Sequence, residues 1–215
     1  ARLNARQQVI AGSRALEYAK ALIELANDSN VKIQVVSLKS VSDGAAYEPA
    51  GEYANVNGWL KWNPSAGLLT TEGHILSPAT VLEHEAAHGY NDVYGPEDKA
   101  IRNSQDDIMY TDAEEQCVIC FNEYETALAN GEIQTGEITR DNHFGQVVKT
   151  ESEKSNNLHK DAYSLDYYKQ KLAKDVKETI KKRTHKAAIK DFAKKAQKDK
   201  EQKEQVGPRK ENGEF

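Results

Sequence analysis

The stretch SPATVLEHEAAHG at residues 77–89 carries the pattern His-Glu-x-x-His. On a helix, residues four apart lie on one face, so His84 and His88 can bind a single metal ion. Glu85 can then reach a water molecule in the ion's remaining position. The pattern predicts a zinc site with a general base beside it, which is the chemistry of a zinc peptidase. The alternative is an ordinary amphipathic helix that carries two histidines and a glutamate by chance.

Signals for a helix flank the pattern on both sides. Ser77 before Pro78 is typical of an N-cap followed by proline at the first helical position. Gly95 before Pro96 is typical of a helix end. The sequence therefore predicts a helix over residues 78–94.

Catalytic zinc normally has three protein ligands, so a third ligand is needed. The extended pattern His-Glu-x-x-His-x-x-Gly-x-x-His fails, because Asn91 and Tyr94 occupy the positions that require Gly and His. Asp92 lies on the same helical face, but about 12 Å along the axis from His84. One ion cannot join these residues, so we expect a carboxylate from a following helix.

Two adjacent glutamates, Glu114 and Glu115, are the candidates for this third ligand. Residues 111–114 also fit a capping box with Glu114 at its third helical position, which gives that residue a structural alternative. We prefer Glu114 as the ligand, with Glu115 as the alternate. Glu123 and Glu125 lie two turns later and are expected to be solvated or to support the ligands.

Hydrophobic periodicity predicts the other elements of the chain. Expected helices cover residues 6–26, 113–130 and 160–202. Expected strands cover residues 31–36, 58–62 and 67–71, the last two joined as a hairpin, with a short second hairpin within residues 132–140. Residues 40–55 and 96–107 are expected to be loops. This order indicates an α+β domain in which a small sheet packs on the metal helix and an extended peptide could add beside it.

Charge divides the 215 residues unevenly and indicates a domain boundary. Through Lys160 there are 13 Lys and Arg against 24 Asp and Glu, a net charge of −11. The remaining residues carry 16 against 10, a net charge of +6. We predict a peptidase domain at residues 1–158, a Lys-rich helical extension at 159–202 and a disordered tail at 203–215. No run approaches 18 apolar residues, so no transmembrane helix is expected.

Two further features favour structural interpretations. Cys117 and Cys120 form a lone C-x-x-C without the second pair that a zinc ribbon needs, and they fit one face of the second helix. Lysines at 181–195 could bind an anionic polymer or membrane surface, but acidic residues are interspersed among them. A solvated helix is favoured there, and nucleic acid is not expected as a partner.

The motif residues together resemble the zinc metallopeptidase domains of secreted bacterial effectors and of RHS-type polymorphic toxins. The resemblance rests on the motif at 84–88, on the pair Glu114-Glu115 that follows it, and on Arg140 with His143. Type III-secreted effector proteases and clostridial neurotoxin light chains are similar in this pattern. Those families carry Arg-x-x-Tyr downstream, where this chain has His143 at the last position.

The resemblance implies a zincin-like fold, a gluzincin-like ligand set and a catalytic Zn²⁺. Its expected ligands are His84, His88 and Glu114, with Glu85 as general acid and base. Arg140 and His143 are expected to stabilise the oxyanion. The implied partners are a protein or peptide substrate and a cognate immunity or inhibitor protein, for an effector domain excised from a longer secreted or delivered chain. A zinc-binding interaction module without catalysis is the alternative, although such a module has no use for Glu85.

Overall fold

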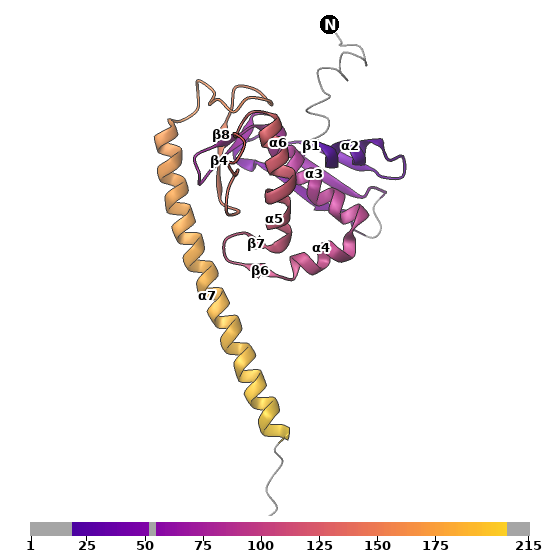
Figure 1. Cartoon of the computed structure of the whole chain (residues 1–215), viewed down its shortest axis with the longest axis vertical. Coiled ribbons are helices and arrows are strands. Elements are labelled where there is room, and N and C mark those ends of the chain that lie inside the picture. Colours follow the sequence, from indigo (N-terminus) through magenta and orange to yellow (C-terminus); the bar gives the residue numbers. More distant parts are fainter. Residues whose placement is uncertain (1–18, 52–54, 206–215) are drawn as a thin grey trace, which may run out of the picture. The chain divides into compact units, whose positions relative to one another are not determined.

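The computed structural model describes residues 19–51 and 55–205, and within them small sheets lie beside several helices (Figure 1). The architecture is α+β, as the sequence predicts. The chain divides into two compact units between Asp175 and Val176. The first unit contains two three-stranded sheets, a two-stranded ribbon and the helices around the motif. The predicted domain boundaries at 158 and 202 stay predictions.

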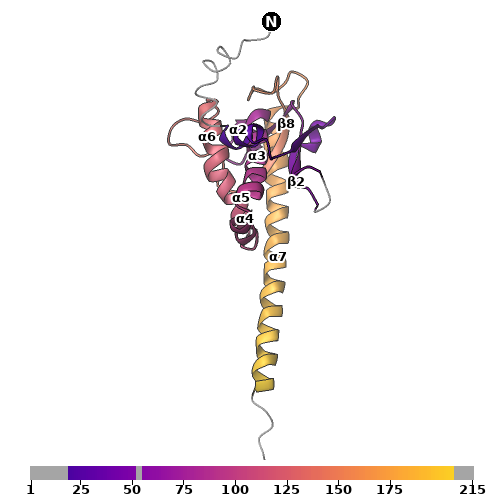
Figure 2. The ribbon, with the colours of Figure 1, turned by 90° about the vertical axis from the view of Figure 1, so that its right-hand side faces the viewer.

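Helix α3, Pro78–Tyr94, carries the motif and confirms the predicted helix. Its N-cap is Ser77, whose hydroxyl accepts a hydrogen bond from the Thr80 N–H, and Gly95 ends it. In the view of Figure 2 the helix lies between α6 (Tyr124–Ala129) and strand β2 (Ala45–Pro49), and it also contacts α2 (Lys20–Asn27). Eight of its residues are buried. This central position explains the small residues Ala86 and Ala87, which pack into the core.

Two three-stranded sheets flank this helix. The first has the order β1-β3-β2, with β1 (Ile33–Ser37) parallel and β2 (Ala45–Pro49) antiparallel to β3 (Gly58–Trp62). The second has the order β5-β4-β8, all antiparallel, formed by Ile75–Leu76, Ala66–Thr70 and Gly145–Lys149. A short ribbon pairs β6 (Asp106–Asp107) with β7 (Thr111–Asp112).

The predicted hairpin between residues 58–62 and 67–71 is wrong. The strands exist as β3 and β4, but they belong to different sheets. Strand β3 has a partner on each edge, β1 and β2, so β4 pairs with β5 and β8 instead. The turn between them is held by Asn63, which accepts hydrogen bonds from the Ser65 and Ala66 N–H groups.

Three other predictions of local structure also differ from the structure. Residues 40–55 were expected to be a loop but contain the 3-10 turn Val41–Asp43 and strand β2. Residues 96–107 contain helix α4, Pro96–Asn103, a polar helix whose proline and first-turn acids are its only start signals. No strand occurs at residues 132–140, where Gln134 and Glu137 form a turn, and β8 follows at Gly145–Lys149.

The predicted helix over 113–130 is present, but it is not a regular α-helix. It runs as α5 (Ala113–Val118), a π-helical segment η2 (Ile119–Glu123) and α6 (Tyr124–Ala129). Gly131, with φ of 73°, follows its end. A π-helical turn is rare and frequently occurs at functional sites.

At the two ends of the described chain, one short and one long helix are observed. Helix α2 (Lys20–Asn27) forms the end of the predicted 6–26 helix, whose first part lies outside the described residues. The buried carboxylate of Glu83 on α3 accepts hydrogen bonds from the Ala21 and Leu22 N–H groups and so caps α2. Helix α7 (Leu165–Gln205) begins in the first unit, where Tyr168 and Leu172 are buried. No described helix is long and apolar enough to cross a membrane.

Candidate metal centre

The three side chains His84, His88 and Glu115 meet between α3 and α5. The Nε2 atoms of His84 and His88 lie 3.3 Å apart. Glu115 Oε2 lies 3.3 Å from each of these two nitrogens. The three atoms therefore form a triangle with equal sides.

This triangle fits a tetrahedral metal ion. Zinc–nitrogen and zinc–oxygen bonds of about 2.0–2.2 Å separate neighbouring ligand atoms by roughly 3.3–3.5 Å. Glu115 Oε2 is buried, and imidazole nitrogens of His84, His88 and His143 lie within 3.3 Å of it. Imidazole nitrogens and a carboxylate oxygen are the usual ligands of catalytic zinc. The chemistry of these donors and their spacing fit a metal ion such as zinc.

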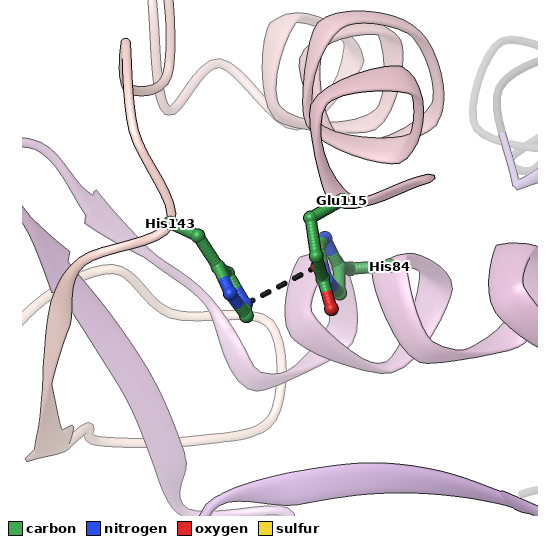
Figure 3. Close-up of side chains that lie close together, drawn as sticks. All are labelled: His84, Glu115 and His143. Atoms are coloured by element: carbon green, nitrogen blue, oxygen red, sulfur yellow. Dashed lines mark ion pairs between the residues drawn. The ribbon is translucent and has the colours of Figure 1, made fainter. Parts of the chain in front are cut away.

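His143 approaches the same point from the loop that precedes β8 (Figure 3). Its Nε2 lies 3.2 Å from Glu115 Oε2, and its ring stacks on that of His84 with centroids 6.0 Å apart. Together with His84 and Glu115, it forms a group that could hold a metal ion. The other ring nitrogen, Nδ1, lies 3.2 Å from the Thr111 hydroxyl.

Thr111 has a backbone conformation that its residue type rarely adopts. Its φ is 88°, in the left-handed region that β-branched residues avoid. Such strain costs about 1–3 kcal/mol and concentrates at functional sites. The strained residue contacts His143 and immediately precedes Asp112, the N-cap of α5.

The far nitrogen of His84 is held by a glutamate and an arginine, which we call the His84 arm. His84 Nδ1 lies 3.0 Å from Glu123 Oε2. Arg140 donates from Nε to Glu123 Oε1 at 2.9 Å and from Nη2 to Glu123 Oε2. Both side chains of this ion pair are almost fully buried. Arg140, expected to face the oxyanion, thus has two of its donors directed at Glu123.

The far nitrogen of His88 is held in the same way, by the His88 arm. His88 Nδ1 lies 3.3 Å from Glu114 Oε1, which also accepts a hydrogen bond from Asn91. Arg102 donates from Nε to Glu114 Oε2 at 2.6 Å. Glu114 therefore contacts the Nδ1 side of His88, whereas Glu115 faces the two Nε2 atoms. This geometry does not support our preference for Glu114 over Glu115.

Charges within the cluster shift the pKa values of its members. Burial disfavours charged imidazoles, but hydrogen bonds to Glu114 and Glu115 outweigh burial and raise the pKa of His88 to about 10. The pKa of His84 is raised by its carboxylate neighbours against the same burial. Burial lowers the pKa of His143 to about 4, in spite of the nearby Glu115. Despite its burial, Glu115 has a pKa well below the usual range because of its histidine contacts.

Glu85 lies at the edge of the cluster and borders an open pocket. Its Oε2 accepts a hydrogen bond of 2.8 Å from the Tyr47 N–H of strand β2. The pocket has a volume of about 220 Å³, and His84, Glu85 and His143 are part of its wall. The apolar part of the wall consists of small and branched side chains, Ala45, Ala66, Leu68, Val81 and Val147. A peptide bound in this pocket would lie beside Glu85, His84 and His143.

Comparison with known families identifies a family for this chain. Residues 3–136 match the family model Peptidase M91, described as effector protein, and this segment covers more than half of the chain. The chain belongs to the Peptidase M91 effector family. Comparisons with curated proteins and with solved structures gave no match.

Membership of the M91 family accounts for the cluster in chemical terms. It implies a metallopeptidase effector that acts on a protein substrate, and the description as an effector implies secretion. The matched segment contains His84, Glu85, His88 and Glu115, whereas Arg140 and His143 follow it. Glu123 was expected to be solvated or to support the ligands, and it contacts His84. The contacts of Asn91 and Arg102 with the cluster could not be assigned from sequence, since only the fold brings them together.

Proposed function

We propose that this M91 protein is a zinc-dependent endopeptidase with a zincin-like active site, delivered as an effector against another cell's protein. The observation that supports it best is the 3.3 Å triangle of His84 Nε2, His88 Nε2 and Glu115 Oε2, with Glu85 beside it. Its oxygen corner is buried among imidazole nitrogens, as expected of a metal ligand. A purely structural zinc site has no use for a general base, whereas Glu85 borders the same pocket as His84 and His143.

In this proposal His84, His88 and Glu115 would hold the zinc ion, and Glu114 takes a supporting role. Metal-binding histidines usually direct their second ring nitrogen at a carboxylate, which fixes the orientation of the ring. Glu123 does this for His84 and Glu114 does it for His88. Arg140 then acts through Glu123, because it is bound to that carboxylate.

The residues around the triangle divide the catalytic work. Zinc, when bound, would act as a Lewis acid toward the attacking water and the scissile carbonyl. Glu85 takes the proton of the water and passes it to the leaving amine. The Tyr47 N–H donates a hydrogen bond to one oxygen of Glu85 and so restricts this carboxylate. His143, neutral at pH 7 because its pKa is lowered to about 4, is placed to donate a hydrogen bond to the developing oxyanion.

Zinc content of purified variants tests the ligand set. After chelation and reconstitution, plasma mass spectrometry should find about one zinc per chain in the parent, as in other catalytic sites. Glu115→Ala should lose most of this zinc, whereas Glu114→Ala should weaken binding by about 10–100-fold and still load at high zinc. Glu125→Ala, an exposed glutamate of the same helical segment, is the matched control. A parent without zinc would overturn the metal site.

Peptide cleavage tests the activity separately. We expect the zinc-loaded parent to generate new peptide termini in a proteome-derived peptide library analysed by mass spectrometry. Glu85→Gln should retain zinc and lose this cleavage by at least about 100-fold, because it lacks the general base. A zinc-loaded Glu85→Gln protein with full activity would disprove the role of Glu85.

A further inference from the structure

Gly89 follows the second motif histidine inside α3, where glycine costs about 1 kcal/mol relative to alanine. The structure gives a reason for it. A Cβ atom at this position would lie 3.0 Å from Tyr47 Cε2 and 3.2 Å from Tyr47 Cδ2. Gly58 on β3 meets the same ring, since its Cβ would lie 2.6 Å from Tyr47 Cε2. The Tyr47 ring thus lies between two glycines that leave room for it.

Polar contacts fix the same ring at its far end. The Tyr47 hydroxyl donates a hydrogen bond of 2.8 Å to Asp92 Oδ2. Lys99 Nζ lies 3.2 Å from Asp92 Oδ1, donates to the His88 carbonyl at 3.0 Å, and lies 4.9 Å from the ring centroid. The ring is therefore held against α3 at one turn beyond the motif. Asp92, too far along the helix to be a metal ligand, has its role here.

The backbone of Tyr47 connects this anchored ring to Glu85. Strand β2 is at the edge of its sheet, and the Tyr47 N–H is directed away from β3 to Glu85 Oε2 at 2.8 Å. Since the ring fixes Tyr47 against α3, it also fixes the direction of this N–H. Hydrogen bonds to a charged acceptor are stronger than neutral ones, so the contact restricts the carboxylate effectively.

We propose that Tyr47 is a positioning residue for the general base: its ring, seated between Gly58 and Gly89, directs its N–H to Glu85 Oε2. The proposal rests on the proposed peptidase function, because it assigns Glu85 a catalytic use. A misplacement of about 1 Å at a reacting group can cost about 100-fold in rate. In this proposal Gly89 contributes to the position of Glu85 by leaving room for the Tyr47 ring, and it has no role in binding the metal.

Amide hydrogen exchange measured by NMR tests the contact directly, with zinc present or removed. The Tyr47 N–H should exchange slowly for an edge strand, and Glu85→Ala should accelerate it by about tenfold or more. The Leu60 N–H of the central strand β3 is the internal reference and should not change. Equal exchange of the Tyr47 N–H in parent and Glu85→Ala would overturn the proposal.

Gly89→Ala tests whether the ring carries the effect. It should accelerate exchange of the Tyr47 N–H. Tyr47→Leu, which lacks the ring, should accelerate exchange at position 47 as well, and adding Gly89→Ala to it should have no further effect. Gly95→Ala is the matched control, because its Cβ would meet only Asn91 O at 3.7 Å. Unchanged exchange in Gly89→Ala would disprove the seating of the ring.

Separate measurement of kcat and KM tests whether Tyr47 positions the general base during catalysis. On a peptide that the parent cleaves, Gly89→Ala should lower kcat by about 10–100-fold with similar KM and a retained zinc ion. An unchanged kcat together with a displaced Tyr47 N–H would overturn the positioning role alone. A parent that binds no zinc or cleaves nothing would instead remove the proposed function, and the positioning role with it.

Discussion

The His84 arm and the His88 arm have the same chemical order, histidine to glutamate to arginine, but they differ in exposure. Glu123 and Glu114 are both buried, with side-chain exposures of 1% and 2%. Their arginines differ: Arg140 is 4% exposed and Arg102 is 27% exposed. Arg102 can therefore exchange its partner for water, whereas Arg140 cannot.

The difference in arginine exposure separates two roles of the glutamates, orienting a metal-binding histidine and stabilising the fold. Both glutamates orient an imidazole, so both should influence metal binding. Of the two arginines, Arg140 alone has almost no access to solvent, so loss of its partner Glu123 should also destabilise the fold. The His88 arm is a ligand support whose removal leaves the protein folded.

Removal of each glutamate should give the largest contrast. We expect Glu123→Ala to lower the free energy of unfolding by about 3–5 kcal/mol, because it leaves Arg140 buried and unpaired. Glu114→Ala should cost about 1–3 kcal/mol, since Arg102 can turn toward solvent. Urea denaturation of the zinc-free proteins measures both, with Glu125→Ala, within about 0.5 kcal/mol of the parent, as control. Equal losses would show that the exposure of the arginine is irrelevant.

Acid sensitivity should sharpen the same contrast. Burial alone would raise the pKa of Glu123, but Arg140 and His84 outweigh it and lower the value from 4.5 to about 2. A carboxylate with a lowered pKa stabilises the fold above its unfolded value of 4.5, and this contribution disappears as pH falls toward about 2. The free energy of unfolding should then fall by up to about 1.4 kcal/mol per pH unit from this one group.

Glu123→Gln should lack this component of the acid response. Denaturation midpoints of parent and variant between about pH 6 and about pH 3 would show it, because the variant curve is flatter below the unfolded pKa. Parallel curves would contradict the assigned role of Glu123.

Conservative replacement of the arginines should give the smallest effect and the finest comparison. Arg102→Lys should change the free energy of unfolding by less than about 1 kcal/mol, since partly exposed ion pairs contribute little. Arg140→Lys should cost more, because lysine cannot make the two parallel hydrogen bonds that Arg140 makes to Glu123. Thermal unfolding of the zinc-free variants resolves the two. A larger effect at Arg102 would reverse the comparison.

The motif helix could be predicted from sequence because its signals are local. Ser77, Pro78 and Gly95 act within one turn of the ends of α3, and no distant contact is needed to interpret them. Strand pairing is different, since β4 could not be assigned to β8 without knowing that β1 and β2 already occupy both edges of β3. The polar helix α4 has no apolar stripe by which periodicity could find it.

The contacts that Glu114 and Glu115 make depend on where α5 begins. We placed the cap at Thr111, which puts Glu114 at the third helical position. The N-cap is Asp112, whose side chain accepts a hydrogen bond from the Glu115 N–H. A shift of one residue rotates the helix by about 100°, so it changes which glutamate is directed at the two Nε2 atoms. The left-handed conformation of Thr111 could not be predicted from its residue type, so the sequence did not indicate that the helix begins one residue later.

The π-helical segment η2 has a consequence for how this chain can vary in length. Glu115 and Glu123 approach opposite nitrogens of the same imidazole, at 3.3 and 3.0 Å, from either end of a helix that widens between them. Removing one residue from the wide turn would rotate Glu123 by about 100° about the axis and carry Arg140's partner away from His84. Related chains that keep this arrangement should therefore align without gaps from 115 to 123, however freely their loops grow or shrink.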